Sequence, residues 1–551
     1  MAPITSTCQV TRQQFTISDF EQALLQQMQL PLPTTCIEAR HQNRMAYRNE
    51  RNLYHGTCHL TNKSILSTYH PESPYKIYSQ EAWWSDNWDP MQYSQDYDFS
   101  RPFFEQFKEL QLKVPRMNLF NTQNENSEFC NYTTKNKNCY LVFGGDYNED
   151  SLYSGFNFYS KNVIDTYFVT NLELCYQCLD CEKCYNLKYS QNSHNCSDSA
   201  FLYDCRGCKN CLGCVGLRNK EYHIYNVPHT KEEYEAKLAA ANLHTRSGVT
   251  SMNTNFEQFI NRFPLKAVNN SNCENCTGDR LANCKNSINT FDLFNAEDIE
   301  NSMMGGDAKT CSSCSYFGHK AEFFYEMANS IEGNNCAFCI ATWYSNDTRY
   351  SDSCMNSNNL FGCVSLKRKQ FCILNKQYTQ EEYNQLIPRI IEHMKSTGEW
   401  GKFFPIQNSP FAYNETVAQE YFPLTKDQAT AAQLKWRDKD QKEYQAATIT
   451  PPDSIDEVDH SICNQILACE ITGKNFKIIP AELQLYKQMR IPIPTKSPET
   501  RHTERFAKRN YPKLYSATCA KTGQPIWTSY PPQKHSRVYS EQAYEQYLYG
   551  T

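Results

Sequence analysis

Small and apolar residues recur at every third position through the middle of the chain. Between Cys175 and Cys214 these positions hold Cys, Ser and Leu, and the same spacing extends back to Cys130. A period of three matches neither the roughly 3.6-residue period of an α-helix nor the two-residue period of a strand. Small side chains at short, fixed spacing suit the narrow interior of a β-solenoid, whose coils stack on one another. We therefore predict a β-solenoid over residues 130–229.

A second stretch with the same spacing predicts a second β-solenoid over residues 269–378. The three-residue spacing of small residues holds from Cys284 to Cys314, and by Cys339 it has resumed in a shifted register. We expect the intervening segment, residues 317–335, to be an inserted surface loop, which is where binding groups tend to occur. No arrangement of a nucleophile or a base is evident among its polar residues His319, Glu322 and Glu326.

Both predicted solenoids end in the same sequence pattern. Cys214 and Cys363 are followed by matching residues without a gap, 149 positions apart. In each copy a threonine, Thr230 or Thr379, precedes a glutamate by three residues, which is the capping box that begins a helix. We expect a hairpin and a helix to cover the open edge of each solenoid. Stacked coils also predict internal ladders of Cys, Ser and Leu, with ladders of Asn at the bends.

The two ends of the chain are copies of one another. The segment from Cys8 aligns without a gap with the segment from Cys469, 461 positions further on, which indicates an internal duplication. A helix is predicted from Ser18 to Met28 in one copy and from Pro480 to Met489 in the other, each stopped by a Pro-x-Pro turn. The order of knuckle, helix and hairpin resembles a zinc-ribbon or treble-clef module.

These patterns together predict a fold that is mainly β with α elements. Two tandem β-solenoid units are flanked by duplicated zinc-ribbon-like α+β modules. The predicted segments are the N-terminal module 1–90, an irregular aromatic connector 91–129, the first solenoid 130–229, a helical linker 230–268, the second solenoid 269–378, a helix and extended linker 379–460, and the C-terminal module 461–551.

The cysteines of the end modules are candidate metal ligands. A structural zinc site takes four thiolate or imidazole ligands, usually from Cys-x-x-Cys pairs. Each knuckle here keeps at most one thiol, because Cys8 is followed by Thr11 and Cys58 by Thr61. We therefore predict knuckles that bury their thiols without a cofactor, and we keep zinc as the alternative. The candidate ligands are Cys8, Cys36, Cys58, Cys469 and Cys519.

The cysteine quartets of the first solenoid also resemble a run that binds an iron–sulfur cluster or zinc. However, Leu and Ser take the same positions in the repeat, as at Leu187 and Ser190, and a metal ligand cannot be replaced by Leu. No proline follows the fourth cysteine, Cys184. We predict buried thiols that pack as small side chains.

The sequence RHxxRxxxRN occurs once in each end module. Its three arginines are four positions apart, so a helix would place them on one face. Guanidinium groups stacked in this way suit phosphate or carboxylate groups, and we predict contacts with nucleic acid, against the alternative of a solvated basic face. The residues are Arg40, Arg44 and Arg48 in the first copy and Arg501, Arg505 and Arg509 in the second.

The overall charge does not select a class of partner, since the formal net charge is -5. The first residues lack the apolar core of a signal peptide, and no run approaches the roughly 18 apolar residues of a membrane span. We therefore expect a cytoplasmic protein without a membrane partner. Because thiols stay reduced in that compartment, the 27 cysteines indicate buried thiols or metal sites in preference to disulfides.

Several strings carry a resemblance to a known family: GCVSLKRKQFCILNKQYTQEEYNQLIPRIIEHM, GEWGKFFP, SPFAYNETVAQEYFPLTKDQA and CEITGKNFKII. Over most of its length the chain resembles an uncharacterised bacterial family, of the small-genome, candidate-phyla type, of cysteine-repeat proteins with zinc-ribbon-like terminal modules. The resemblance implies no particular activity. Terminal knuckles in that family often read Cys-x-x-Cys, and this chain departs from the pattern at Thr11, Ala39, Thr61, Ser79 and Ala82.

A non-catalytic binding or scaffold protein is the function that these features favour. The solenoids would space two basic end modules that contact RNA or a ribonucleoprotein such as the ribosome. One alternative is a carbohydrate-binding or carbohydrate-active β-helix protein, suggested by the Tyr-, Asn- and Asp-rich outer surface. Its candidate carboxylates are Asp180, Asp198 and Asp204, which we interpret as bend residues in preference to catalytic ones. The other alternative is a zinc or thiol store.

Overall fold

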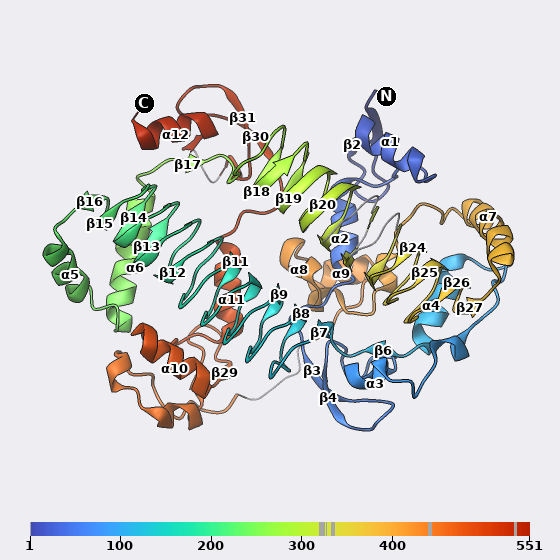
Figure 1. Ribbon diagram of the computed structural model, residues 1–551, viewed down its shortest axis with the longest axis horizontal. Helices are drawn as coiled ribbons and strands as arrows, with labels where there is room; N and C mark the ends of the chain where they lie inside the picture. Colours follow the sequence, from blue (N-terminus) through green and yellow to red (C-terminus); the bar gives the residue numbers. More distant parts are fainter. Residues whose placement is uncertain are drawn as a thin grey trace.

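Two β-solenoids form the centre of the protein, as predicted (Figure 1). The computed structural model describes residues 2–318, 325–326, 328–331, 337–438, 444–533 and 537–550. Strands of neighbouring coils pair in parallel, and Gly155 pairs with Tyr167, which in turn pairs with Leu179. The usual coil therefore contains 12 residues. Since inward positions are three residues apart, a coil has four short sides.

The strands of both solenoids are short. Those of the first solenoid are β7 (Asn121–Thr122), β8 (Asn131–Thr134), β9 (Phe143–Asp146), β10 (Gly155–Phe158), β11 (Tyr167–Thr170), β12 (Tyr185–Lys188), β13 (Ser197–Tyr203), β14 (Lys209–Val215) and β15 (Glu221–Ile224). Those of the second are β18 (Gly278–Lys285), β19 (Thr290–Glu300), β20 (Met303–Ser312), β21 (Ser315–Gly318), β22 (Ala328–Ile331), β23 (Ile340–Trp343), β24 (Asn346–Arg349), β25 (Asn358–Phe361) and β26 (Gln370–Ile373).

A left-handed backbone conformation at every third residue explains the period of three. Leu174, Gln177, Asp180 and Lys183 have φ values of 54°, 49°, 51° and 53°, and the residue after each of them points inward. This conformation costs an L-residue roughly 1–2 kcal/mol. Hydrogen bonds between coils offset the cost, since the backbone N–H of Gln177 donates to the carbonyl of Ile164 at 3.1 Å.

The inward cysteines act as small hydrogen-bond donors. The Sγ of Cys178 donates to the carbonyl of Leu187 at 3.3 Å. In the second solenoid the Oγ of Ser345 makes the equivalent bond to the carbonyl of Cys354 at 3.4 Å. Thiol and hydroxyl therefore serve the same purpose, which explains why Cys and Ser exchange along the repeat.

Asparagine ladders run along the bends, as predicted. The side-chain amide of Asn126 donates to the side-chain oxygen of Asn138 at 3.0 Å, and Asn289 donates in the same way to Asn301 at 2.7 Å. These asparagines occupy the left-handed position, which Asn tolerates better than most residues. The ladders hold the corners of successive coils in register.

The predicted inserted loop at residues 317–335 is wrong in its described part. Ser315 pairs with Ala328 and Ala328 pairs with Ile340, so the solenoid continues through this segment with one coil of 13 residues. The single extra residue shifts the register of the triplets. Glu326 is buried, whereas His319 and Glu322 lie outside the described residues.

Each solenoid ends as predicted in a hairpin strand and a capped helix. The end strands are β16 (Val227–Pro228) and β27 (Lys376–Gln377), and both pair antiparallel with the last coil. The helices α5 (Lys231–Ala240) and α7 (Gln380–Ser396) begin with complete capping boxes at Thr230 and Thr379. Two more helices, α4 (Phe103–Lys113) and α6 (Arg246–Ile260), pack on the second and the first solenoid respectively.

The two end modules contain the same elements in the same order. The N-terminal module consists of β1 (Ile4–Thr7), β2 (Gln14–Ile17), α1 (Asp19–Gln27), α2 (Ile37–Met45), β3 (Tyr54–Thr57), β4 (Ser64–Ser67), β5 (Ile77–Tyr78) and α3 (Gln80–Trp84). The C-terminal module consists of β28 (Leu467–Ala468), β29 (Asn475–Phe476), α10 (Pro480–Met489), α11 (Pro498–Ala507), β30 (Tyr515–Thr518), β31 (Pro525–Thr528), β32 (Val538–Tyr539) and α12 (Glu541–Tyr549).

The halves of the molecule are related by an approximate two-fold rotation (Figure 1). Strand β5 pairs in parallel with β6 (Arg116–Met117), just before the first solenoid. Strand β32 pairs in the same way with β17 (Leu265–Lys266), just before the second. The solenoids lie side by side, and successive coils of the first solenoid follow one another in the direction opposite to those of the second. Each end module bridges both solenoids.

Short elements connect these parts. They are η1 (Pro90–Tyr93), η2 (Ile406–Asn408), η3 (Tyr413–Glu415), α8 (Val417–Tyr421), α9 (Lys426–Ala431), η4 (Ile455–Glu457) and η5 (His460–Asn464). None of the helices in the described part of the chain combines the length and the apolar character needed to cross a membrane.

Candidate functional site

The arginines of the N-terminal RHxxRxxxRN motif lie inside the protein. Arg40 donates to Glu21 at 2.7 Å and to Ser313 of the second solenoid at 2.8 Å. Arg44 is fully buried, and its Nε donates to Ser315 at 3.1 Å. Arg48 lies beyond the end of α2, contrary to the predicted single helical face, because the helix stops at Met45.

The C-terminal copy has the same arrangement. Arg501 and Arg505 both form ion pairs with Asp165 of the first solenoid, at 3.0 and 2.8 Å. Arg509 lies beyond the end of α11 and pairs with Asp180 at 3.0 Å and with Asp292. The six arginine side chains are at most 7% exposed. They join the end modules to the solenoids, so they do not present the basic surface that nucleic-acid contacts require.

The candidate metal ligands of the end modules are thiols held by hydrogen bonds, and Cys8 and Cys36 lie beside one another. The Sγ of Cys8 accepts from the backbone N–H groups of Thr11 at 3.4 Å and Cys36 at 3.2 Å. Burial raises the pKa of Cys8, but hydrogen bonds from Thr11 and from backbone N–H groups outweigh it and bring the pKa to about 6. Similar bonds bring the pKa of Cys469 and Cys519 to about 6, and that of Cys58 to about 7.

These thiols do not assemble into a recognisable metal centre. Burial raises the pKa of Cys36, the second thiol of the first knuckle. Within the described residues, no three His, Cys, Asp or Glu side chains are grouped so that they could hold a metal ion. A structural zinc site needs four such ligands. The zinc hypothesis thus lacks a four-ligand site in the part of the chain that the structure describes.

A polar cleft of about 410 Å³ lies where the two solenoids meet the C-terminal module. The first solenoid contributes Asn192, and strand β18 of the second contributes Arg280. The C-terminal module contributes Lys508 at the end of α11, together with Tyr530 and Arg537 around the β31–β32 connection. This volume is within the usual range of roughly 300–1,000 Å³ for small-molecule sites.

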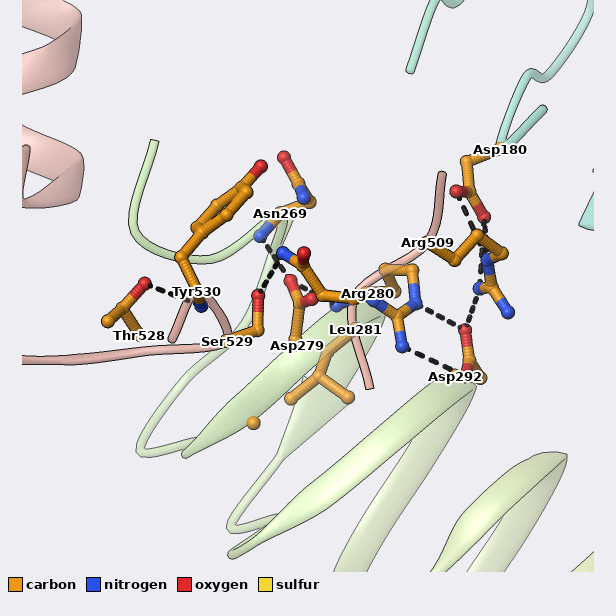
Figure 2. Close-up of polar contacts among 12 residues, drawn as sticks. Asp180, Asn269, Asp279, Arg280, Leu281, Asp292, Arg509, Thr528, Ser529 and Tyr530 are labelled. Atoms are coloured by element: carbon orange, nitrogen blue, oxygen red, sulfur yellow. Dashed lines mark hydrogen bonds and ion pairs between the residues drawn. The ribbon is translucent and has the colours of Figure 1, made fainter. Parts of the chain in front are cut away.

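A chain of ion pairs forms one wall of the cleft (Figure 2). Arg509 donates to both carboxylate oxygens of Asp180, at 3.0 and 3.2 Å, and also contacts Asp292. Arg280 lies between Asp292, at 2.7 Å, and Asp279, at 2.6 Å. Burial raises the pKa of Asp292, but Arg280 and Arg509 outweigh it and hold the pKa below its ordinary value. Arg280 and Arg509 are thus neutralised inside the protein.

Hydrogen bonds fix further residues around the cleft. The backbone N–H of Asn269 donates to Asp279 at 2.7 Å, and the side-chain amide of Asn510 donates to Ser529 at 2.9 Å (Figure 2). The hydroxyl groups of Tyr203 and Tyr530 are 3.3 Å apart, which links the first solenoid to the C-terminal module. The cleft is therefore formed by side chains that the fold already holds in place.

The equivalent position in the other half of the molecule is filled. Phe120 and Asn269 occupy equivalent positions, each three residues after the matching strands β6 and β17. The backbone N–H of Phe120 donates to Asn131, and that of Asn269 donates to Asp279. The space beside Phe120 measures only about 10 Å³. Phe120 stacks on Tyr132 at 5.1 Å, and Tyr69 stacks on Phe411 at 5.1 Å. Aromatic side chains thus occupy the space that remains open beside Asn269.

Sequence reasoning did not identify this cleft, because its walls come from three distant segments. Asp180 is a bend residue, as predicted, with a φ of 51°, and it also forms an ion pair with Arg509, for which the sequence predicts a phosphate contact. A signal does exist in the sequence: the aromatic residue Phe120 in one half is replaced by Asn269 in the other.

No protein-family model matches the chain, and a search of curated proteins found no match. The family resemblance therefore stays a prediction.

Proposed function

We propose that the protein is a non-catalytic binding protein that holds a small polar ligand in the cleft. The two solenoids and the end modules act as its rigid frame. The observation that carries the proposal is the difference between the two halves: the same position is filled by Phe120 in one half and left open and polar in the other.

The filled half demonstrates that the fold does not require a cleft. Burying one aromatic side chain stabilises a protein by about 1.5–3 kcal/mol. The open half forgoes this stabilisation and instead lines the space with amides, hydroxyls and cations. A ligand that satisfies these groups would offset the loss, since it stabilises the state to which it binds.

The ion pairs of the cleft support binding in preference to catalysis. A general base has to accept and release a proton during each turnover. Asp180 and Asp292 are instead held by Arg509, and Arg280 also holds Asp292. RNA binding through the arginine motifs is not part of this proposal, because those side chains are buried.

A variant that closes the cleft tests the proposal. Asn269→Phe copies the residue that fills the other half, and we expect the variant to fold. Wild type and variant are compared by thermal unfolding with hexoses, hexose phosphates, nucleoside monophosphates, amino acids and dicarboxylates. We expect at least one compound to raise the unfolding temperature of wild type by more than about 2 °C and to leave Asn269→Phe unchanged.

Lys521→Phe is the matched control. It adds the same side chain at an exposed turn of the same module, outside the cleft, and should respond to ligand as wild type does. A compound that stabilises all three proteins equally binds elsewhere. That outcome, or a panel without any stabilising compound, contradicts the proposed function.

A further inference from the structure

We propose that the ligand of the cleft is a small phosphate ester of a sugar, the chemistry shared by sugar phosphates and mononucleotides. The inference rests on the proposed function and adds the chemical class of the ligand. It is carried by two features of the cleft: cations at the rim that form no ion pair with a described residue, and a buried amide deeper inside that hydrogen-bonds with none of the described residues.

The rim carries two cationic side chains, although burial lowers the pKa of Lys508 against the opposing effect of Glu257 and Glu504. Lys508 and Arg537 both line the cleft, and neither forms an ion pair with any described residue. The guanidinium of Arg537 is positioned by a hydrogen bond to the carbonyl of Arg262 at 3.0 Å, and its other N–H groups donate to none of the described side chains. Arginine and lysine together suit a phosphate group, which offers two negative charges and several acceptor oxygens.

The interior of the cleft offers hydrogen bonds to hydroxyl groups. Asn192 is only 7% exposed, and none of the described residues hydrogen-bonds with its side-chain amide. Buried amides normally have partners, so this one lacks a partner that a ligand can supply. An amide both donates and accepts, as does a hydroxyl group. Asp180 lies on the same cleft, and its carboxylate can accept further hydrogen bonds beyond those from Arg509.

Apolar side chains complete the site. Ile260 and Phe263, at the end of α6, line the cleft and are only partly buried. They can cover the carbon face of a sugar ring while its hydroxyl groups face Asn192 and Asp180. A phosphate near Lys508 and Arg537, with a sugar ring held by the interior, accounts for each of these three groups of residues.

Calorimetric titration of the full chain tests the inference. The probes are glucose 6-phosphate, ribose 5-phosphate and adenosine 5′-monophosphate, each compared with its parent glucose, ribose or adenosine. We expect at least one phosphate ester to bind at least tenfold more tightly than its parent. Tightest binding of adenosine 5′-monophosphate would assign the site to nucleotides, and tightest binding of a sugar phosphate would assign it to that class.

Variants assign the binding to the named residues. The double variant Lys508→Met with Arg537→Met should bind the phosphate ester at least tenfold more weakly than wild type does. It should bind the ester no more tightly than the parent compound. Asn192→Leu should weaken the binding of the phosphate ester and of its parent compound to the same extent. Lys487→Met with Lys521→Met removes two exposed cations from the same module away from the cleft, and should leave binding unchanged.

Two results would overturn the inference, and they differ in what they imply for the proposed function. If parent sugars or dicarboxylates bind as tightly as the esters and Asn269→Phe blocks them, the phosphate inference fails and the binding function stands. If no probe binds wild type in calorimetry and no compound of the thermal panel stabilises it, both proposals fail.

Discussion

At the scale of single residues, the solenoid surface supplies carboxylates to the end modules. Asp165 forms ion pairs with Arg501 and Arg505. Glu300 accepts a hydrogen bond of 2.5 Å from the hydroxyl of Ser18, which is the N-cap of α1. Burial of such a group is favourable only when its charge is compensated. Asp165 has two cationic partners, whereas Glu300 has a neutral one. The two carboxylates should therefore respond differently to pH.

Glu300 should make the protein less stable as the pH rises from about 4.5 to about 7. Burial, with Glu21 and Asp19 nearby, raises the pKa of Glu300 from 4.5 to about 7, although Ser18 and Arg40 oppose the shift. Between these two values the folded state binds the proton more tightly than the unfolded state, so the free energy of unfolding falls as the pH increases. We expect Glu300→Gln to remove about 1–3 kcal/mol of this decline.

Urea unfolding at pH 5 and pH 8 measures this effect. Wild type should lose more stability over that interval than Glu300→Gln does. Glu297→Gln, which removes a more exposed carboxylate from the same strand, is the control and should follow wild type. Parallel pH profiles for wild type and Glu300→Gln would show that Glu300 does not titrate in this range.

Residue spacing alone could not reveal where the arginines point. The spacing of four correctly placed Arg40 beside Arg44, and Arg501 beside Arg505, on α2 and α11. Their partners are far away in the sequence: Ser313 and Ser315 for the first pair, Asp165 for the second. A basic helix face that meets a distant carboxylate has the same sequence pattern as one that meets solvent or nucleic acid.

At the scale of elements, the period of three allows the solenoid to be predicted from the sequence, because it reflects which side chains point inward. The inward residue follows a left-handed residue, so small side chains mark the interior directly. The 12-residue coil was not predicted, because all four sides carry the same triplet, although the recurrence of Asn126, Asn138, Asp150 and Asn162 every 12 residues does mark its length. The register shift near Ala328 was correctly located, but its cause is one added residue in a coil.

The bends should tolerate glycine better than alanine. Asn289 has a φ of 52°, and its side chain donates to Asn301. Asn289→Ala loses this hydrogen bond and keeps a Cβ in the left-handed region, so we expect a loss of about 1–2 kcal/mol in the free energy of unfolding.

Asn289→Gly loses the same hydrogen bond but relieves the left-handed conformation. It should therefore be more stable than Asn289→Ala in urea unfolding, the reverse of the usual order within a strand or helix. An alanine variant as stable as the glycine variant would indicate that the conformation at this bend carries little strain.

At the scale of the whole molecule, each end module connects the two solenoids. The N-terminal half reaches the second solenoid through Arg40 and through Phe103, whose ring lies 5.2 Å from that of Tyr350. The C-terminal module reaches the first solenoid through Arg505 and through Tyr486, whose ring lies 5.7 Å from that of Tyr176. The two halves therefore share a continuous interior.

Separate expression of the halves tests this arrangement. The chain can be divided at Asn242, an exposed residue between α5 and α6. We expect fragments 1–241 and 242–551, when produced together, to form a stable complex with a ratio of one to one in size-exclusion chromatography. Asp165→Lys in the first fragment should weaken this complex, because it places a positive charge against Arg501 and Arg505. Fragments that elute separately as folded monomers would contradict the shared interior.

The thiol-lined interior also determines the redox chemistry of the protein. Of the described cysteines, only Cys273, Cys276 and Cys463 are partly exposed, and the others are buried. Burial raises the pKa of Cys139 to about 12, so its reactive thiolate form is scarce at neutral pH. An oxidant or an alkylating reagent can reach such a thiol only after the coils around it separate. The rate at which Cys139 is modified is therefore set by how often the solenoid opens around it.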